Sequence, residues 1–412
     1  MDVFDKRVIG YSSAKDRLRQ IADCLIRSDE YKMRGAQLPH GLLMVSAPGT
    51  GKSTLADCLI KTVNRKTIVF KKDSESNSFL VDMKKAFEQA KDNSPSIILL
   101  EDIHLYGSNA YASEWAGLQS AIDECKNDDV FVIATANTLE RVTESLLRPG
   151  RFDYVLKLDT PKGETAEAII AHYLEDKNLD DDICISDIVK VLDNCSCATL
   201  ESTLNVASLN AIYEDSDTIC KRHMVDAIMQ VVFQMRRSDR EFTSFDIETI
   251  AVHEASHAVV AEVLRPEHTS VVTLLTDGEG SVGMTGIYER GFTTEDEMFD
   301  LVTINLAGKA GTDLMYGRND MGTLKDLDNA YQYLAGWATE LAGGGFCSLE
   351  SSHRSTSEAS IKSHEDLIAS KMDELYMRAK KILCENRDYL ERVRDALLEK
   401  GTLLNSDVVA LR

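Results

Sequence analysis

The segment that most constrains the fold is a glycine-rich loop at residues 46–53, with the sequence SAPGTGKS. An apolar run at residues 42–45 precedes it, and a stretch with helical character follows at residues 53–60. Such a loop can surround a phosphate with backbone N–H groups, and the positive end of the following helix favours the anion. The loop fits the G-x-x-x-x-G-K-[ST] pattern, except that Ser46 occupies the first glycine position. It predicts an α/β nucleotide-binding core; the alternative is a glycine-rich turn that binds no nucleotide.

Short apolar runs predict a parallel sheet in this core. They occupy residues 42–45, 67–70, 97–100 and 130–133, and residues 154–158 are a candidate for a fifth strand. Runs that are apolar throughout, rather than alternating, suit strands buried on both faces. We therefore expect a parallel sheet with helices on each side.

Several residues of the core are expected to bind ATP and Mg²⁺. Lys52 would contact the β- and γ-phosphate oxygens, and Ser53 would ligate Mg²⁺. Asn137 follows the fourth apolar run, where its amide can orient the attacking water. The expected contacts in and after the phosphate loop are Pro48, Gly49, Thr50, Gly51, Lys52, Ser53 and Thr54.

Two carboxylates, Glu101 and Asp102, follow the third apolar run. In most such ATPases an Asp that holds the Mg²⁺ shell comes first and a Glu that activates water comes second. Here the order is reversed, so each carboxylate differs by one methylene from the usual residue. Because hydrolysis depends on precise positioning, the reversed pair predicts slowed turnover rather than its loss. The alternative is that both residues only end a strand.

Arg148 and Arg151 lie in the sequence RPGRFD, which predicts a tight turn. Such a turn can present arginines to the γ-phosphate held by a neighbouring subunit, as arginine fingers. That role would require a ring of subunits. The alternative is a pair of surface salt bridges.

A second motif, His253-Glu254-Ala255-Ser256-His257, is typical of a zinc-binding helix. Histidines four residues apart lie on one face of a helix, one turn apart, where both can ligate one ion. Glu254 can then act as general base toward the metal-bound water. A catalytic zinc needs a third protein ligand, and spacing alone leaves these candidates: Asp313, Asp320, Asp326, Asp328, His268 and His353. The alternative is a chance match with two histidines at the edge of a core.

The chain divides into three predicted domains. Residues 1–160 form the large ATPase domain, residues 161–235 a small helical domain, and residues 240–412 a mostly helical zincin-type peptidase with a small β patch. The polar stretch at residues 236–240 is the expected boundary before the peptidase. The tail predicts two amphipathic helices between residues 364 and 400, ended by Gly401 in a left-handed C-cap.

Composition restricts the binding partners and the cellular compartment that we expect for the protein. The net charge of −22 argues against general nucleic-acid binding, which requires Lys and Arg to neutralise phosphates. The nine cysteines form no CxxC pair, so we expect reduced thiols in a cytoplasmic compartment. No apolar run reaches the roughly 20 residues of a membrane span, and no signal peptide is recognised.

Taken together, these motifs resemble the FtsH-type ATP-dependent zinc metalloproteases over nearly the whole chain. The zinc helix, residues 253–260, matches the family except that Ser256 stands where Gly is usual. The sensor-2 segment, residues 195–200, matches except that cysteines replace its glycines. The matching segments are residues 8–10, 146–153, 195–200, 253–260, 385–388 and 397–400.

The resemblance implies roles that the residues alone do not give. Ile9 and Gly10 would contact adenine, and Asp326 would be the third zinc ligand, because a Tyr-Gly turn at residues 316–317 precedes its helix. The family architecture implies a hexameric AAA+ ring stacked on a protease ring. Unfolded or tagged proteins would be pulled through the pore and cut in a chamber, as in protein quality control, with ATP, Mg²⁺ and Zn²⁺ as cofactors.

Two further departures from the family bear on this interpretation. The pore-loop region, residues 73–80, lacks the usual Gly, although Phe79 and Leu80 offer an aromatic and an aliphatic side chain for gripping substrate. Family members usually carry membrane-spanning helices before the ATPase domain, which here starts almost at residue 1. We therefore expect a soluble portion or an anchor-less relative, placed at the cytoplasmic face of a membrane if the parent protein is longer.

Three hypotheses follow from the motifs and their departures. The first is an ATP-driven zinc endopeptidase. The second is a zinc peptidase whose ATPase half is a nucleotide-binding assembly module of low turnover. The third is a protein-remodelling ATPase with an inert peptidase domain.

Overall fold

The computed structural model describes residues 2–72, 79–107, 113–235, 243–276, 282–288, 294–318, 322–341 and 358–412. The chain forms two compact units. The first contains Met1–Asp176 and Asp193–Leu204, and the second contains Lys177–Leu192 and Asn205–Arg412. In the described ranges, none of the helices combines the length and apolar character that crossing a bilayer requires.

The first unit is built on a five-stranded sheet with the order β2-β3-β4-β1-β5. All its paired strands are parallel, which confirms the predicted α/β sheet, including its fifth strand. The strands are β1 (Gly41–Val45), β2 (Lys66–Lys71), β3 (Ser96–Glu101), β4 (Val130–Ala136) and β5 (Tyr154–Lys157).

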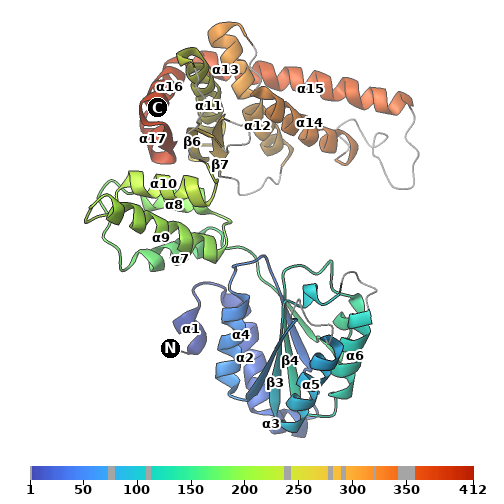
Figure 1. Cartoon of the computed structure of the whole chain (residues 1–412). Helices are drawn as coiled ribbons and strands as arrows, with labels where there is room; N and C mark the ends of the chain where they lie inside the picture. The colour runs from blue at the N-terminus through green and yellow to red at the C-terminus, as the bar shows by residue number, and fades with distance from the viewer. Residues whose placement is uncertain are drawn as a thin grey trace. The chain divides into compact units, whose positions relative to one another are not determined.

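Helices cover both faces of this sheet (Figure 1). On β1, which lies between β4 and β5, Leu42 and Met44 pack into a core with α2 and α4, whereas Leu43 and Val45 pack into a second core with α5 and α6. Successive side chains of a strand point to opposite faces, so a strand covered on both sides must be apolar throughout. The helices of this region are α1 (Val3–Arg7), α2 (Ser12–Ile26), α3 (Ser28–Met33), α4 (Lys52–Val63), α5 (Phe79–Asp92) and α6 (Ser113–Glu124).

Four helices follow the sheet, as predicted for the small helical region. They are α7 (Glu164–Leu174), α8 (Ile185–Leu192), α9 (Cys197–Tyr213) and α10 (Lys221–Val231). The first unit holds α7 and the start of α9, and the second unit holds α8, the rest of α9 and α10. Because the two units divide the small helical region between them, they do not test the predicted domain boundaries, which remain a prediction. The expected boundary at residues 236–240 lies outside the described residues.

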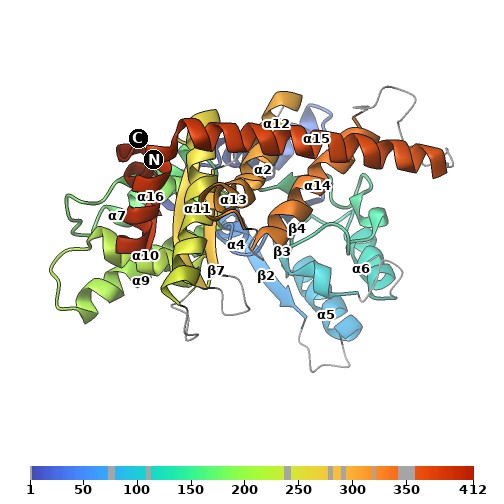
Figure 2. The same cartoon turned by 90° about the horizontal axis from the view of Figure 1, so that it is seen from above.

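The remainder of the second unit is mostly helical with a small antiparallel sheet of order β7-β6-β8. Figure 2 shows the long helix α15 running across α12 and α14, and Ile368 and Leu375 of α15 share a core with those two helices. The elements are α11 (Ser244–Leu264), β6 (Thr269–Thr276), β7 (Val282–Ile287), α12 (Glu295–Asn305), α13 (Ala307–Tyr316), α14 (Thr323–Thr339), α15 (Glu358–Glu385), α16 (Arg387–Lys400), β8 (Thr402–Leu404) and α17 (Asn405–Ala410).

Candidate active sites

Helix α11 carries both histidines of the second motif and the glutamate between them. The helix begins with a capping box in which Thr243 and Asp246 satisfy each other's backbone N–H groups. From Ala251 to Glu262 every residue of α11 is buried. The motif therefore lies on a rigid element inside the second unit rather than on a surface loop.

The two histidines converge with one carboxylate. His253 Nε2 and His257 Nε2 lie 3.0 Å apart, and Asp326 Oδ2 lies 3.0 Å from the first and 3.3 Å from the second. Within the described residues, this is the one group of three or more His, Cys, Asp or Glu side chains whose ligand atoms fall within 4.8 Å of one another. Two imidazoles and a carboxylate form a three-ligand set of the kind that holds a catalytic zinc with one position open.

The surroundings of these side chains favour metal binding. His257 Nδ1 lies 2.7 Å from the carbonyl oxygen of Ile304, so Nδ1 donates its proton there and Nε2 keeps a free lone pair. Burial alone would raise the pKa of Asp326. The neighbouring imidazoles of His253 and His257 outweigh burial and hold that pKa well below its usual value, so Asp326 is anionic. The donor set present therefore fits a zinc ion.

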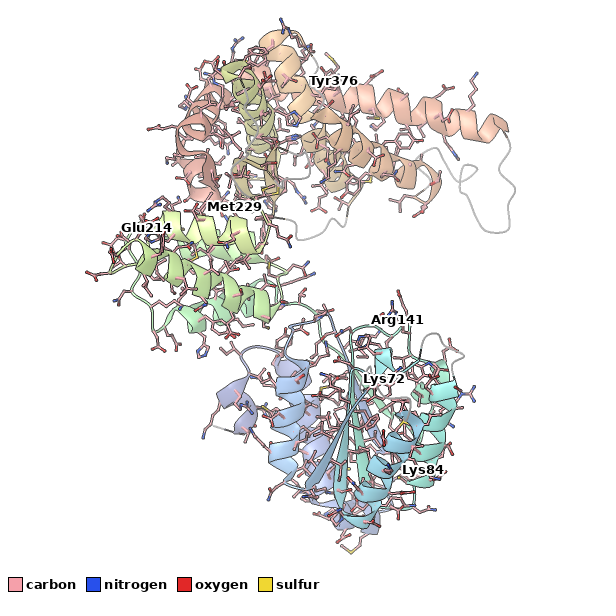
Figure 3. All side chains as sticks on the ribbon, in the orientation of Figure 1. Lys72, Lys84, Arg141, Glu214, Met229 and Tyr376 are labelled. Atoms are coloured by element: carbon pink, nitrogen blue, oxygen red, sulfur yellow. The ribbon has the colours of Figure 1, made fainter. Side chains whose placement is uncertain are left out.

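The other ligand candidates do not converge on this point. Asp313 accepts hydrogen bonds from Tyr376 Oη at 2.8 Å and Lys380 Nζ at 2.6 Å; Tyr376 is labelled in Figure 3. His268 is half-buried and its Nδ1 lies 2.9 Å from the Pro266 carbonyl oxygen, whereas Asp328 is exposed. The two remaining candidates, Asp320 and His353, lie outside the described residues.

Glu254 is buried beside this group of ligands. Its Oε2 accepts a hydrogen bond of 2.7 Å from Thr285 Oγ1, which lies on the edge strand β7. Burial raises the pKa of Glu254, while the neighbouring histidines and the Thr285 hydroxyl oppose the rise. A carboxylate with a raised pKa next to a metal site is suited to accept a proton. The analysis of the sequence missed Thr285, because only the pairing of β7 with β6 brings it to α11.

Two glycines of α13 allow that helix to approach the motif. A Cβ on Gly308 would lie 2.5 Å from Nε2 of both His253 and His257, which is far inside contact distance. A Cβ on Gly311 would overlap Ser256, whose hydroxyl donates to the Val252 carbonyl at 2.6 Å. The serine that replaces the usual glycine of the zinc helix therefore occupies the space that Gly311 leaves open.

Replacing Gly311 by alanine is expected to lower the free energy of unfolding of the second unit by about 1–3 kcal/mol, because its methyl group would overpack against Ser256. The variant Ser256→Gly should restore most of that loss in the double mutant. Urea denaturation measures both effects. Gly336→Ala on α14 is the matched control, since nothing lies within 4 Å of its added Cβ. Equal losses for G311A with and without S256G would contradict the packing argument.

The phosphate loop lies between β1 and α4, as the sequence predicts. Gly49 and Gly51 have φ angles of 75° and 98°, a region that glycine adopts without strain. Ser46, in the first glycine position, has its hydroxyl hydrogen-bonded to that of Thr50. Pro48 precedes the first of these glycines, and α4 begins with Lys52, Ser53 and Thr54.

Lys52 is held inside the loop by three acceptors. Its Nζ donates to the Ser46 carbonyl at 2.7 Å, the Ala47 carbonyl at 3.1 Å and Asn137 Oδ1 at 2.9 Å. Burial lowers the pKa of Lys52, and the negative charge of Asp102 opposes this shift. The amide expected to orient water and the lysine expected to bind phosphate are therefore direct neighbours.

The two acidic residues have different surroundings. Glu101 ends β3, and its Oε2 lies 3.7 Å from Lys71 Nζ of the neighbouring strand. Asp102 has a φ of 52°, and its backbone N–H donates to Thr135 Oγ1 at 3.0 Å. Of the two carboxylates, Asp102 is the one whose charge acts on Lys52. The reversed order thus makes the shorter carboxylate the one that opposes the lowering of the Lys52 pKa.

Within the first unit, the sensor-2 segment at residues 195–200 links the segment expected to contact adenine, residues 8–10, to the phosphate loop. Gly10 has a φ of 68° and, together with Ile9, precedes Tyr11. The Tyr11 hydroxyl lies 3.7 Å from Cys197 Sγ in the sensor-2 segment. The next residue of that segment, Ala198, donates its N–H to the Gly49 carbonyl at 3.0 Å.

The two arginines of the RPGRFD turn are placed differently. Arg151 forms a bidentate ion pair with Asp123, at 2.8 and 3.1 Å, and also donates to the Ser145 carbonyl at 2.6 Å. Arg148 is exposed, and its side chain forms no hydrogen bond or ion pair with the described residues. Of the two arginines, Arg151 is thus held by partners within the first unit, whereas Arg148 extends from an exposed position.

The pore-loop expectation needs a correction at Phe79. Residues 73–78 lie outside the described residues, but Phe79 starts α5 and its side chain is buried. Its ring packs against Phe70 and Tyr106, with ring centroids 5.6 and 5.1 Å apart. Phe79 is therefore a core residue that cannot grip substrate in this conformation, whereas Leu80 is exposed.

Comparison with known proteins places both sites in described families. Residues 42–160 match the ATPase family associated with various cellular activities (AAA), and residues 241–411 match peptidase family M41. The ATP-dependent zinc metalloprotease FtsH 2 of Thermoanaerobacter sp. is 25% identical, over 98% of this chain and 82% of that protein. FtsH 1 of Thermomicrobium roseum is 28% identical, over 98% and 67%. FtsH 1 of Sorangium cellulosum is 26% identical, over 97% and 70%.

Proposed function

We propose that this chain, an FtsH-type protein that joins an AAA ATPase domain to a peptidase family M41 domain, is an ATP-dependent zinc endopeptidase for unfolded or tagged proteins. The observation that carries the proposal is the convergence of His253, His257 and Asp326 beside the buried Glu254. A remodelling ATPase with an inert peptidase domain would have no need of such a donor set.

In this proposal His253, His257 and Asp326 hold zinc. The ion, when bound, supplies Lewis acidity that polarises a peptide carbonyl and lowers the pKa of a water to about 7. Glu254 accepts the proton of the attacking water and later donates it to the leaving amine. Because Thr285 donates to Oε2 of Glu254, the other oxygen, Oε1, remains available for that proton.

The ATPase half supplies the force for unfolding. Lys52 exchanges its loop acceptors for the phosphates, and Ser53 with Glu101 or Asp102 holds Mg²⁺. Arg148 reaches the γ-phosphate of a neighbouring subunit in a homo-hexameric ring. Arg151 supports that turn through its ion pair with Asp123, which fixes the backbone between the two arginines.

Cleavage of an unfolded protein such as casein is expected to require both cofactors. The assay compares ATP, ADP and a non-hydrolysable ATP analogue, and repeats the ATP reaction after chelation and after zinc is restored. We expect cleavage only with ATP and zinc. Similar rates with all three nucleotides would instead support a zinc peptidase with a nucleotide-binding assembly module. ATP hydrolysis without bound zinc or cleavage would support the remodelling ATPase.

A further inference from the structure

A histidine that the sequence analysis did not single out contacts the amide of Asn137. His104 lies in a short 3-10 helix directly after β3 and is buried. Its Nδ1 lies 3.2 Å from the backbone nitrogen of Asn137, and its Nε2 lies 3.1 Å from Asn137 Nδ2. The imidazole therefore contacts both the backbone and the side chain of the residue expected to orient water.

Hydrogen-bonding capacity fixes the tautomer of this imidazole. A backbone N–H can only donate, so Nδ1 of His104 must accept from Asn137 and carries no proton. A neutral imidazole then carries its proton on Nε2, which makes Nε2 a donor. Burial, which disfavours the charged imidazole, lowers the pKa of His104; Asp102 opposes this shift, whereas Lys52 and Arg141 add to it. Arg141 is labelled in Figure 3.

Two donors therefore compete for the single oxygen of the Asn137 amide. Lys52 Nζ holds Oδ1 at 2.9 Å, which leaves the Nδ2 group facing Nε2–H of His104. An amide can offer its oxygen to only one of these partners while its nitrogen faces the other. The orientation seen here is set by Lys52, because a charged donor forms the stronger hydrogen bond.

We propose that His104 is a positioning residue for Asn137 in ATP hydrolysis. When a γ-phosphate takes Lys52 away from Oδ1, Nε2–H of His104 becomes the donor to that oxygen. The amide then turns, and its Nδ2 group faces the phosphate and the attacking water. The inference rests on the proposed ATPase function and adds to it a residue that senses whether Lys52 is bound to phosphate.

The test compares two replacements of His104 with opposite properties. Phenylalanine keeps a flat ring of similar size but has no donor, whereas glutamine can place an N–H₂ group close to the position of Nε2. We expect kcat for ATP hydrolysis to fall about 10- to 100-fold in His104→Phe, with KM for ATP nearly unchanged, and to recover partly in His104→Gln. The reverse ranking, with phenylalanine tolerated, would show that His104 only fills space and would overturn the proposal.

A double-mutant cycle tests whether His104 acts through Asn137. If it does, His104→Phe combined with Asn137→Ala should be no slower than Asn137→Ala alone, since residues that act as a unit are not additive. Additive losses would overturn the proposal. His172→Phe is the matched control, because its side chain is 55% exposed on α7 and should leave kcat unchanged.

A binding measurement separates this inference from the proposed function. The ratio of the affinities for a non-hydrolysable ATP analogue and for ADP needs no turnover. We expect His104→Phe to reduce this ratio several-fold and His104→Gln to keep it. A reduced ratio in a protein that does not hydrolyse ATP would support the role of His104 and contradict the ATPase activity. If His104→Phe hydrolyses ATP with an unchanged kcat and keeps the affinity ratio of the unmodified protein, the role of His104 is refuted. The proposed ATPase function would then still stand.

Discussion

Replacing Glu254 by glutamine is expected to slow cleavage of an unfolded protein by about 10²–10⁴-fold, the range that a general base contributes. Glutamine keeps the shape of the side chain but cannot take a proton from water. Its carbonyl oxygen can still accept the hydrogen bond from Thr285, so the packing of α11 against β7 should persist. Fluorescent casein measures the cleavage rate, and metal analysis measures zinc in the same samples.

The design of this experiment separates chemistry from folding. Glu254→Gln should retain zinc and ATP hydrolysis at the level of the unmodified protein. Glu248→Gln is the matched control, because it makes the same exchange on the same helix away from the ligands and should change cleavage little. Proteolysis at the normal rate by zinc-loaded Glu254→Gln would remove Glu254 from the mechanism.

The nucleotide-binding half shows how much of this fold can be predicted from sequence. Each predicted strand is found, because strands buried on both faces leave continuous apolar runs that do not depend on distant partners. Gly401 ends α16 with a φ of 77°, as expected for a left-handed C-cap. These features are local, so composition and spacing suffice to find them.

Features that depend on distant pairing were missed. The strand β8 has only three residues, Thr402–Leu404, and pairs with β6, for example at Val271 and Leu404. Three residues show no periodicity, and nothing in their spacing points to a partner so far away in the chain. His104 and Thr285 were missed for the same reason, since only tertiary contacts bring them to Asn137 and Glu254.

The third metal ligand shows the same limit within the candidate site. Spacing left six candidates open, and only the family resemblance favoured Asp326. In the structure Asp326 is in the first turn of α14, next to both histidines, while Asp313 is held by Lys380. A carboxylate that joins a site from another helix has no fixed distance in sequence from the histidines, so residue patterns alone cannot identify it.

Replacing Asp326 by alanine is expected to weaken zinc binding by more than about 100-fold, because removal of an outer-shell partner alone typically costs 10- to 100-fold and Asp326 contacts both histidines directly. Proteolysis should be lost with the metal, whereas ATP hydrolysis should continue. Competition with a chromogenic chelator measures the affinity, and metal analysis gives the zinc content per chain.

The matched control is Asp328→Ala, which removes the exposed carboxylate two residues further along the same helix. Because its side chain lies outside the group of ligand atoms that come within 4.8 Å of one another, this variant should bind zinc and cleave casein like the unmodified protein. Zinc retained by Asp326→Ala and lost from Asp328→Ala would assign the metal to the other carboxylate. Zinc retained at full affinity by both variants would show that neither carboxylate is the third ligand, since a site that loses one of its three protein ligands cannot keep its affinity.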